Sequence, residues 1–90
     1  MEDDIEIRRR RAAWRAAHRG TKELDLLIGR FAEARLTGMD AEALAAFERF
    51  LAVADPTLQE WLLAPRKEPA AEHAEIVAAI RGFHGLECSS

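Results

Sequence analysis

The chain has 90 residues and a mass of 10.1 kDa; 49% of its residues are hydrophobic, 32% are charged, and the formal net charge is -3. This length suits one small domain without a deep substrate cavity, which argues against a self-sufficient enzyme. The apolar content excludes a disordered chain, and no apolar run approaches the roughly 20 residues that span a bilayer. A lone cysteine, Cys88, forms neither an internal disulfide nor a zinc site, so we expect a small helical module in a reducing, cytoplasmic compartment.

The first predicted helix covers about residues 4–18. Ile7, Trp14 and Ala17 recur along it at helical spacing, and we expect the Trp14 indole in the core. Gly20 follows at a position typical of a helix C-terminal cap.

Positive charge gathers at this end of the chain. The first 22 residues carry seven basic and four acidic side chains, whereas the next 42 carry three basic and eight acidic ones. The run Arg8–Arg11 leaves two interpretations open. The arginines either form a solvated helix face and pair with acids four residues earlier, Asp4 with Arg8 and Glu6 with Arg10, or they bind nucleic acid.

The second predicted helix begins near Thr21, whose hydroxyl would cap its first turn, and ends near Gly38. Apolar residues at i, i+3, i+4 and i+7 mark the face that we expect in the core. These residues are Leu24, Leu27, Ile28 and Phe31. Gly29 lies inside this helix, where it lowers stability but lets another helix approach closely.

The third predicted helix begins at Asp40 as its N-cap, and the fourth begins at Asp55, an N-cap followed by Pro56 at the first helical position. The expected core residues are Leu44, Phe47, Phe50, Leu51 and Ala54 on the third helix and Leu58, Trp61 and Leu62 on the fourth. Pro65 ends the fourth helix, because the residue before a proline is disfavoured in the helical region.

A linker over residues 65–70 leads to a fifth predicted helix over about 71–83. Its expected core face consists of Ile76, Val77, Ile80 and Phe83. Five short helices with short connections predict an all-α fold, a compact five-helix bundle. We expect one helical domain over residues 1–90, with its core at about 5–83 and a frayed tail at 84–90, and a monomer when free.

Few residues offer catalytic or metal-binding chemistry. His18, His73 and His84 are scattered and form no metal-binding pattern, and Cys88 has no fixed base nearby. The glycines do not follow the spacing of a phosphate-binding loop. We therefore predict no catalytic, metal-binding or cofactor-binding residue.

A polar cluster falls at the junction of the first two predicted helices. Arg19, Gly20, Glu23 and Asp25 lie within seven residues there. One interpretation is local: Arg19 complements the dipole of one helix, Glu23 and Asp25 that of the next, and Gly20 makes the turn. The alternative is a recognition edge in which Gly20 admits a partner's backbone, Arg19 presents its planar set of donors and the two carboxylates accept.

Two segments resemble motifs of a known family. They read Arg19-Gly20-x-x-Glu23-x-Asp25 and Asp55-Pro56-x-Leu58-x-x-Trp61-Leu62. These segments, their order and their spacing are similar to the RGxxExD and DPxLxxWL motifs of the succinate dehydrogenase assembly factor family. The resemblance covers roughly residues 5–83.

The resemblance implies a five-helix assembly chaperone that binds the flavoprotein subunit of succinate dehydrogenase, and of the related fumarate reductase. It would promote covalent attachment of FAD to a histidine of that client. Since the reacting histidine belongs to the client, the factor would be no enzyme and would bind no cofactor tightly by itself. Arg19, Gly20, Glu23 and Asp25 would form its client-binding edge.

Further expectations concern binding partners and location. The protein would neither bind nucleic acid nor insert into a membrane. It would act in a bacterial cytoplasm, with the mitochondrial matrix as the alternative location. The alternative function is a small Arg-rich helical regulator that binds nucleic acid through Arg8–Arg11.

Overall fold

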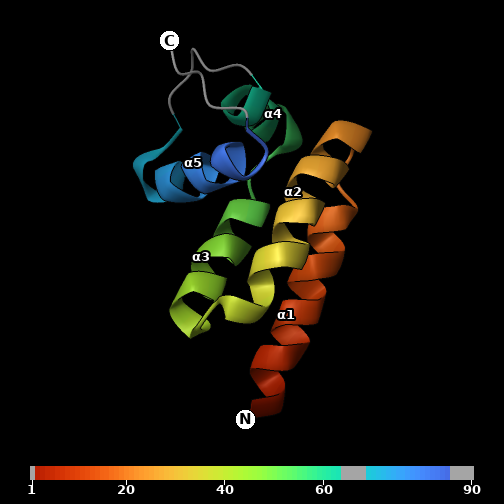
Figure 1. The fold of residues 1–90 in the computed structure, drawn as a ribbon, viewed down its shortest axis with the longest axis vertical. Coiled ribbons are helices and arrows are strands. Elements are labelled where there is room, and N and C mark those ends of the chain that lie inside the picture. The colour runs from red at the N-terminus through yellow and green to blue at the C-terminus, as the bar shows by residue number, and fades with distance from the viewer. Residues whose placement is uncertain (1, 64–68, 86–90) are drawn as a thin grey trace.

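Figure 1 shows a computed structural model of the chain, which describes residues 2–63 and 69–85. The helices are α1 (Glu2–Ala17), α2 (Lys22–Arg35), α3 (Ala41–Leu51), α4 (Asp55–Leu63) and α5 (Ala74–Phe83). Short 3-10 turns, η1 (Leu36–Gly38) and η2 (Ala71–His73), precede α3 and α5. The predicted all-α fold with five helices is confirmed. Pro65, most of the predicted linker and Cys88 lie outside the described residues.

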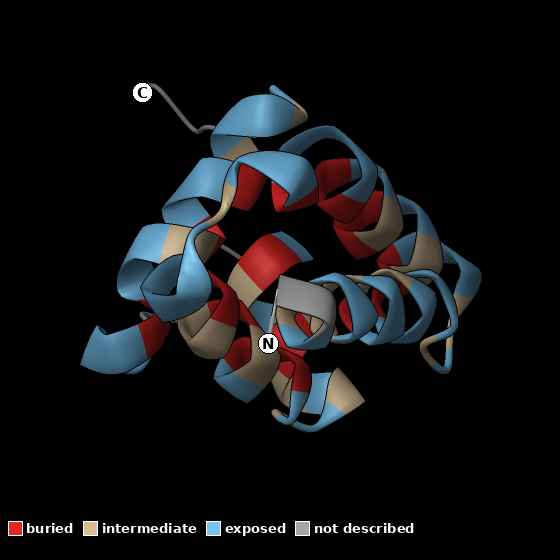
Figure 2. Cartoon of the chain, turned by 90° about the horizontal axis from the view of Figure 1, so that it is seen from below, coloured by how far each residue is buried: buried red, intermediate tan, exposed pale blue. Residues whose placement is uncertain are grey.

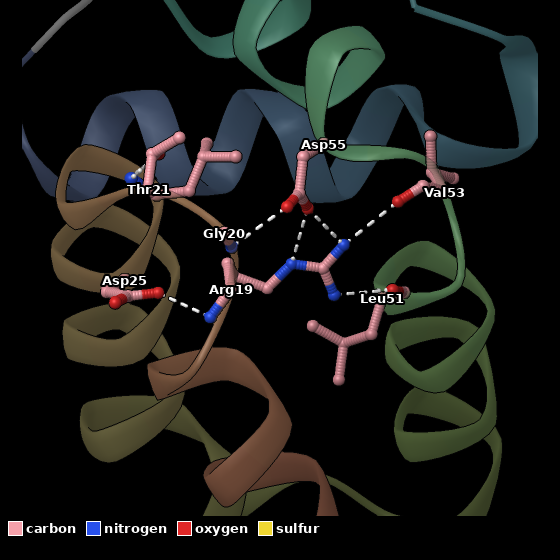
Figure 3. A network of polar contacts seen from close by, with 8 residues as sticks. Arg19, Gly20, Thr21, Asp25, Leu51, Val53 and Asp55 are labelled. Atoms are coloured by element: carbon pink, nitrogen blue, oxygen red, sulfur yellow. Dashed lines mark hydrogen bonds and ion pairs between the residues drawn. The ribbon is translucent and has the colours of Figure 1, made fainter.

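The main helix contacts are not all between neighbours in the chain: α1 packs on both α2 and α3, and α2 also packs on α4 and α5. α1 and α2 run antiparallel side by side, and α3 lies against α1 (Figure 1). α4 and α5 contact each other and cover one end of α2. This arrangement brings the α1–α2 connection next to the connection between α3 and α4 (Figure 3).

Two helix starts follow the predicted capping residues. The Thr21 hydroxyl accepts a hydrogen bond of 3.2 Å from the Leu24 amide, and the Asp40 carboxylate accepts one of 2.8 Å from the Ala43 amide. Each cap satisfies a backbone N–H that the helix itself leaves unpaired, and contributes about 1 kcal/mol.

The core is formed by one apolar face of each helix, turned inward (Figure 2). The predicted core residues that are buried are Leu24, Leu27, Ile28, Phe31, Leu44, Phe47, Phe50, Leu51, Leu58, Leu62, Val77 and Ile80. Ile76 and Trp61 are half-buried at its edge, and the Trp61 indole packs on the His73 ring at a centroid distance of 5.8 Å.

Two core predictions near helix ends are wrong. Ala54 is exposed because α3 ends at Leu51, so the helical periodicity no longer applies to it. Phe83 remains 39% exposed. Its ring meets the Phe31 ring edge-on at a centroid distance of 5.8 Å, and the Arg35 guanidinium lies 5.6 Å from the centroid of the Phe83 ring.

His84, which follows the last residue of α5 and lies past the predicted core boundary at residue 83, contacts α2. A ring nitrogen of His84, Nε2, lies 2.7 Å from the Leu27 carbonyl oxygen, which is hydrogen-bonding distance. His84 therefore contacts the bundle, although it was expected in the frayed tail.

The buried face of α1 also differs from the prediction. Trp14 is 63% exposed and Ile7 47%, whereas the buried residues are Ala12 and Ala16. The cause is a close approach of α1 to α2, which small side chains permit and large ones prevent. At Gly29 of α2 a Cβ would lie only 3.2 Å from the Cα of Ala17, so the expected close approach at Gly29 is confirmed.

The arginine run makes different ion pairs from those predicted within α1. Arg8 reaches across to α3 and binds the Glu48 carboxylate through Nη2 at 2.7 Å and Nε at 3.2 Å. The hydrogen bond from Arg8 lowers the pKa of Glu48. Arg9 pairs with Glu6 at 3.3 Å and donates to the Met39 carbonyl at 2.7 Å. Arg8 thus pairs with Glu48 on α3 in place of Asp4, and Glu6 pairs with Arg9 in place of Arg10.

In residues 2–63 and 69–85, no helix combines the length and the apolar character needed to cross a membrane. The same residues bring together no group of three His, Cys, Asp or Glu side chains that would hold a metal ion.

Candidate functional site

Arg19, the first residue of the predicted recognition edge, lies between α1 and α2 with its side chain pointing into the molecule (Figure 3). The side chain is only 11% exposed. Its guanidinium donates through Nε at 3.0 Å and Nη2 at 2.7 Å to the same Asp55 oxygen. It also donates through Nη2 at 3.0 Å to the Val53 carbonyl and through Nη1 at 2.6 Å to the Leu51 carbonyl.

The position of these carbonyls explains why a cation is stable there. Leu51 is the last residue of α3, and Val53 follows in the turn to α4. Carbonyls at a helix C-terminus lack partners within the helix and carry the negative end of its dipole. The Arg19 guanidinium satisfies two such carbonyls, and the Asp55 carboxylate balances its charge.

Asp55 joins the same corner to Gly20. The Gly20 amide donates to the second oxygen of Asp55 at 2.9 Å. A Cβ on Gly20 would lie 2.5 Å from that oxygen, so any side chain at this position would displace the carboxylate. The absence of a side chain at Gly20 is thus required by this contact.

Asp55 does not act as the predicted N-cap of α4. Its carboxylate is taken by Arg19 and Gly20, and the backbone bond at the start of α4 runs from the Leu58 amide to the Ala54 carbonyl at 3.0 Å. Asp55 belongs to the helix as its first residue and faces the α1–α2 connection.

Asp25 closes the corner from the α2 side. Its carboxylate accepts a hydrogen bond from the Arg19 backbone amide, and the residue is half-buried in the first turn of α2. Both ends of Arg19 are therefore held, the backbone by Asp25 and the side chain by Asp55. This side-chain-to-backbone hydrogen bond ties the α1–α2 connection to the first turn of α2.

Glu23 has a different environment from these residues. It is exposed in the first turn of α2, and its carboxylate has no hydrogen bond or ion pair with another described residue. Gly20 is exposed as well. The four predicted edge residues thus lie together, but only Gly20 and Glu23 face outward. The expectation that Arg19 presents free donors is wrong, because four of its five N–H groups are bound within the molecule.

Sequence reasoning missed Asp55 as a member of this site. Asp-Pro before a helix is a common capping pattern, and that local explanation hid a partner 36 residues from Arg19. The useful signal was the presence of two motifs in one short chain. The structure joins the first residue of one motif to the first residue of the other.

The corner can recognise a partner by shape and charge. It presents a backbone without a side chain at Gly20 and an exposed carboxylate at Glu23, both on a support held by the Arg19–Asp55 ion pair. Groups held in place before binding lose little conformational entropy when a partner docks.

The chain is similar to proteins of one family. Residues 10–84 match the family described as "Flavinator of succinate dehydrogenase". The chain is 51% identical over 61 residues to the FAD assembly factor SdhE of Acetobacter pasteurianus, covering 68% of this chain and 56% of that protein. It is 38% identical over 71 residues to the FAD assembly factor SdhE of Legionella pneumophila, covering 79% and 87%. The chain thus spans little more than half of the Acetobacter relative, and no solved structure matches it.

Proposed function

This chain belongs to the family of succinate dehydrogenase flavinators, as its two motifs indicated, and we propose that it binds the flavoprotein subunit of succinate dehydrogenase or of the related fumarate reductase. It promotes covalent attachment of FAD to a histidine of that subunit, as an assembly factor and not as the catalyst. The observation that carries the proposal is the family match over residues 10–84. The names of its bacterial relatives, FAD assembly factors, support it.

The client-binding edge in this proposal is the α1–α2 corner. Gly20 and Glu23 contact the client, because both are exposed and the Glu23 carboxylate has no hydrogen bond or ion pair within the part of the chain that the structure describes. Arg19 and Asp25 act as positioning residues, because their polar groups are used to hold the corner in shape.

The mechanism requires that the factor bind one conformation of the client more tightly than another. The favoured conformation holds the methyl group of the flavin against the client histidine. Holding two reacting groups in place lowers a reaction barrier by several kcal/mol without an added acid or base. The factor on its own binds FAD no more than weakly.

The proposal extends to location and assembly state. The free factor is a monomer in a bacterial cytoplasm, which the bacterial source of its relatives supports, and the mitochondrial matrix is the alternative.

Two of the four arginines that the nucleic-acid alternative requires are bound within the molecule. Arg8 is bound to Glu48, and Arg9 donates to the Met39 carbonyl. A binder that relies on phosphate contacts would lose affinity steeply with added salt. Salt-dependent binding of DNA or RNA, without any binding of the flavoprotein, would favour that alternative.

The test is flavinylation in a purified system. The flavoprotein without covalent flavin is incubated with FAD, with and without the factor, and protein-bound flavin fluorescence is measured after denaturing electrophoresis. We expect the factor to increase covalent flavin, and Glu23→Gln to reduce that increase. Glu42→Gln is the matched control, because Glu42 is an exposed carboxylate in the first turn of α3. Equal covalent flavin with and without the factor would contradict the proposal.

A further inference from the structure

The outward face of α1 carries an apolar surface that neither the core nor the corner uses. Trp14 and Ile7, seven residues apart, are 63% and 47% exposed. The Trp14 indole stacks on the His18 ring at a centroid distance of 4.2 Å and an interplanar angle of 13°. The His18 ring nitrogen Nδ1 is in turn 2.7 Å from the Trp14 carbonyl oxygen. The indole is thus exposed and also held in one orientation.

A groove between α1 and α2 lies beside this tryptophan. Its volume is about 470 Å³. It is lined by Ala13, Ala17, Lys22, Asp25, Leu26, Gly29, Arg30 and Glu33. The small residues Ala17 and Gly29 make it where the two helices approach closely, and Leu26, which is 50% exposed, adds an apolar wall. Trp14 does not line the groove, but it directly follows Ala13 and lies one helical turn from Ala17, and both of these residues do.

This surface reaches the corner proposed to bind the client. Asp25 lines the groove and also holds the Arg19 backbone. His18, on which Trp14 stacks, directly precedes Arg19. A partner seated on Gly20 and Glu23 would therefore lie next to both the groove and the indole.

The charges around Trp14 are positive, and one of them, on Arg11, also helps to lower the pKa of Glu48. Arg10 and Arg11 lie four and three residues before it, on the same side of the helix. Both are exposed, and neither has a hydrogen bond or ion pair with another described residue, in contrast to Arg8 and Arg9. A complementary partner would place carboxylates against these arginines.

We propose that Trp14 and the α1–α2 groove form a second docking surface, which takes an apolar side chain flanked by carboxylates on the flavoprotein client. This inference rests on the proposed function for the identity of the partner. The groove carries two basic side chains, Lys22 and Arg30, and two acidic ones, Asp25 and Glu33. A surface for nucleic acid is predominantly basic, so this balance favours a protein partner. An exposed tryptophan that is already oriented, next to arginines, has the composition of a binding hot spot.

The test observes Trp14 directly. The chain has two tryptophans, so 5-fluorotryptophan incorporated into the Trp61→Phe variant gives one fluorine resonance, from Trp14. We expect unlabelled flavoprotein to shift or broaden this resonance. In the Trp14→Phe variant the remaining resonance comes from Trp61, at the edge of the core, and we expect it to stay unchanged.

Measuring the affinity of variants for the flavoprotein shows how much each side chain contributes to binding. Trp14→Ala should weaken flavoprotein binding by roughly 30-fold or more, the size of a hot-spot residue. Leu63→Ala is the matched control, since Leu63 is an exposed apolar residue on α4. Reversing charge in Arg10→Glu/Arg11→Glu should slow association, whereas the exposed Arg49 on α3 provides the control Arg49→Glu.

The outcomes separate this inference from the proposed function. If the flavoprotein binds, but the Trp14 resonance does not change and Trp14→Ala binds as tightly as the wild type, the second docking surface is wrong and the proposed function stands. If the flavoprotein does not bind the wild-type factor, both are wrong. A change of the Trp14 resonance without flavoprotein, on concentrating the factor or adding a DNA oligonucleotide, assigns the surface to a second copy or to nucleic acid and also overturns the inference.

Discussion

Arg19 and Trp14 lie five residues apart, and both side chains lie opposite to expectation. Arg19 was expected at an exposed edge and is nearly buried, whereas Trp14 was expected in the core and is exposed. The arginine is 11% exposed, with its guanidinium turned toward α3 and α4, whereas the tryptophan is 63% exposed on α1. The difference shows what each environment supplies. The end of α3 offers two free carbonyls and Asp55, which compensate a buried charge, while the close approach of α1 to α2 leaves no room for an indole.

The comparison also separates two tasks in the proposed client interface. In the proposal, Arg19 gives the corner its shape through its bonds within the molecule, whereas Trp14 lies outside the core and offers its indole to a partner. Substitutions at the first kind of residue should change the stability of the fold. Substitutions at the second kind should change binding alone.

The largest expected effect on stability comes from removing Asp55. Asp55→Ala leaves the Arg19 guanidinium buried without its counter-ion, and should lower the free energy of unfolding by about 2–4 kcal/mol, allowing for the partial exposure of Asp55. That is a large share of the roughly 5–15 kcal/mol that stabilises a small domain. Urea denaturation measures it. Loss of only about 1 kcal/mol, as for the cap variant Asp40→Ala, would show that the ion pair does not hold the corner.

Gly20→Ala should have the next largest effect. The new Cβ would lie 2.5 Å from the Asp55 carboxylate, which must move away from Arg19, so we expect a loss of about 1–3 kcal/mol. Gly38→Ala is the control, because nothing lies within 4 Å of a Cβ there. Thermal unfolding of the two variants compares them. Equal melting temperatures would contradict the requirement for glycine at Gly20.

Glu48 offers a smaller effect that depends on pH. Because Arg8 lowers the pKa of Glu48, the ionised carboxylate stabilises the fold above its usual pKa of 4.5, and this stabilisation is lost as the pH falls through the lowered value. Since both side chains are partly exposed, Glu48→Gln should cost about 0.2–1 kcal/mol at pH 7. Denaturation at pH 7 and at pH 3 tests this. A difference between variant and wild type that grows in acid would have the wrong sign.

The smallest expected effect on stability belongs to the outward-facing residues. Glu23→Gln and Trp14→Ala should each change the free energy of unfolding by less than about 0.5 kcal/mol, because neither side chain takes part in the core. The midpoint of urea denaturation measures the stability, and the far-ultraviolet circular dichroism of each variant checks that its helices are formed. A large loss of stability in either variant would make that residue structural, and would remove the distinction between Arg19 and Trp14.

Most of the fold followed from local sequence patterns. Apolar residues at helical spacing identified the core faces of α2, α3, α4 and α5, and Thr21 and Asp40 marked two helix starts. These features depend on neighbours within one or two turns of a helix, which a sequence displays directly.

The errors arose where a distant partner decides the conformation. The face of α1 was misassigned because alanines at Ala12 and Ala16 give a weaker pattern than Trp14, although small residues are what the contact with α2 requires. The inward turn of Arg19 depends on Asp55, 36 residues away. The position of the corner residues next to one another could be predicted, but their division into inward and outward groups could not.

The ion pair between Arg19 and Asp55 also bears on the order in which the molecule is built. Contacts between residues far apart in sequence form late, because the intervening chain must first be closed into a loop at a cost in entropy. The Arg19 guanidinium finds its acceptors only after α3 has ended and α4 has docked beside it. A chain with only its first two helices folded would therefore lack a fixed corner. The proposed binding edge therefore depends on the docking of α3 and α4 as well as on the two helices that carry it.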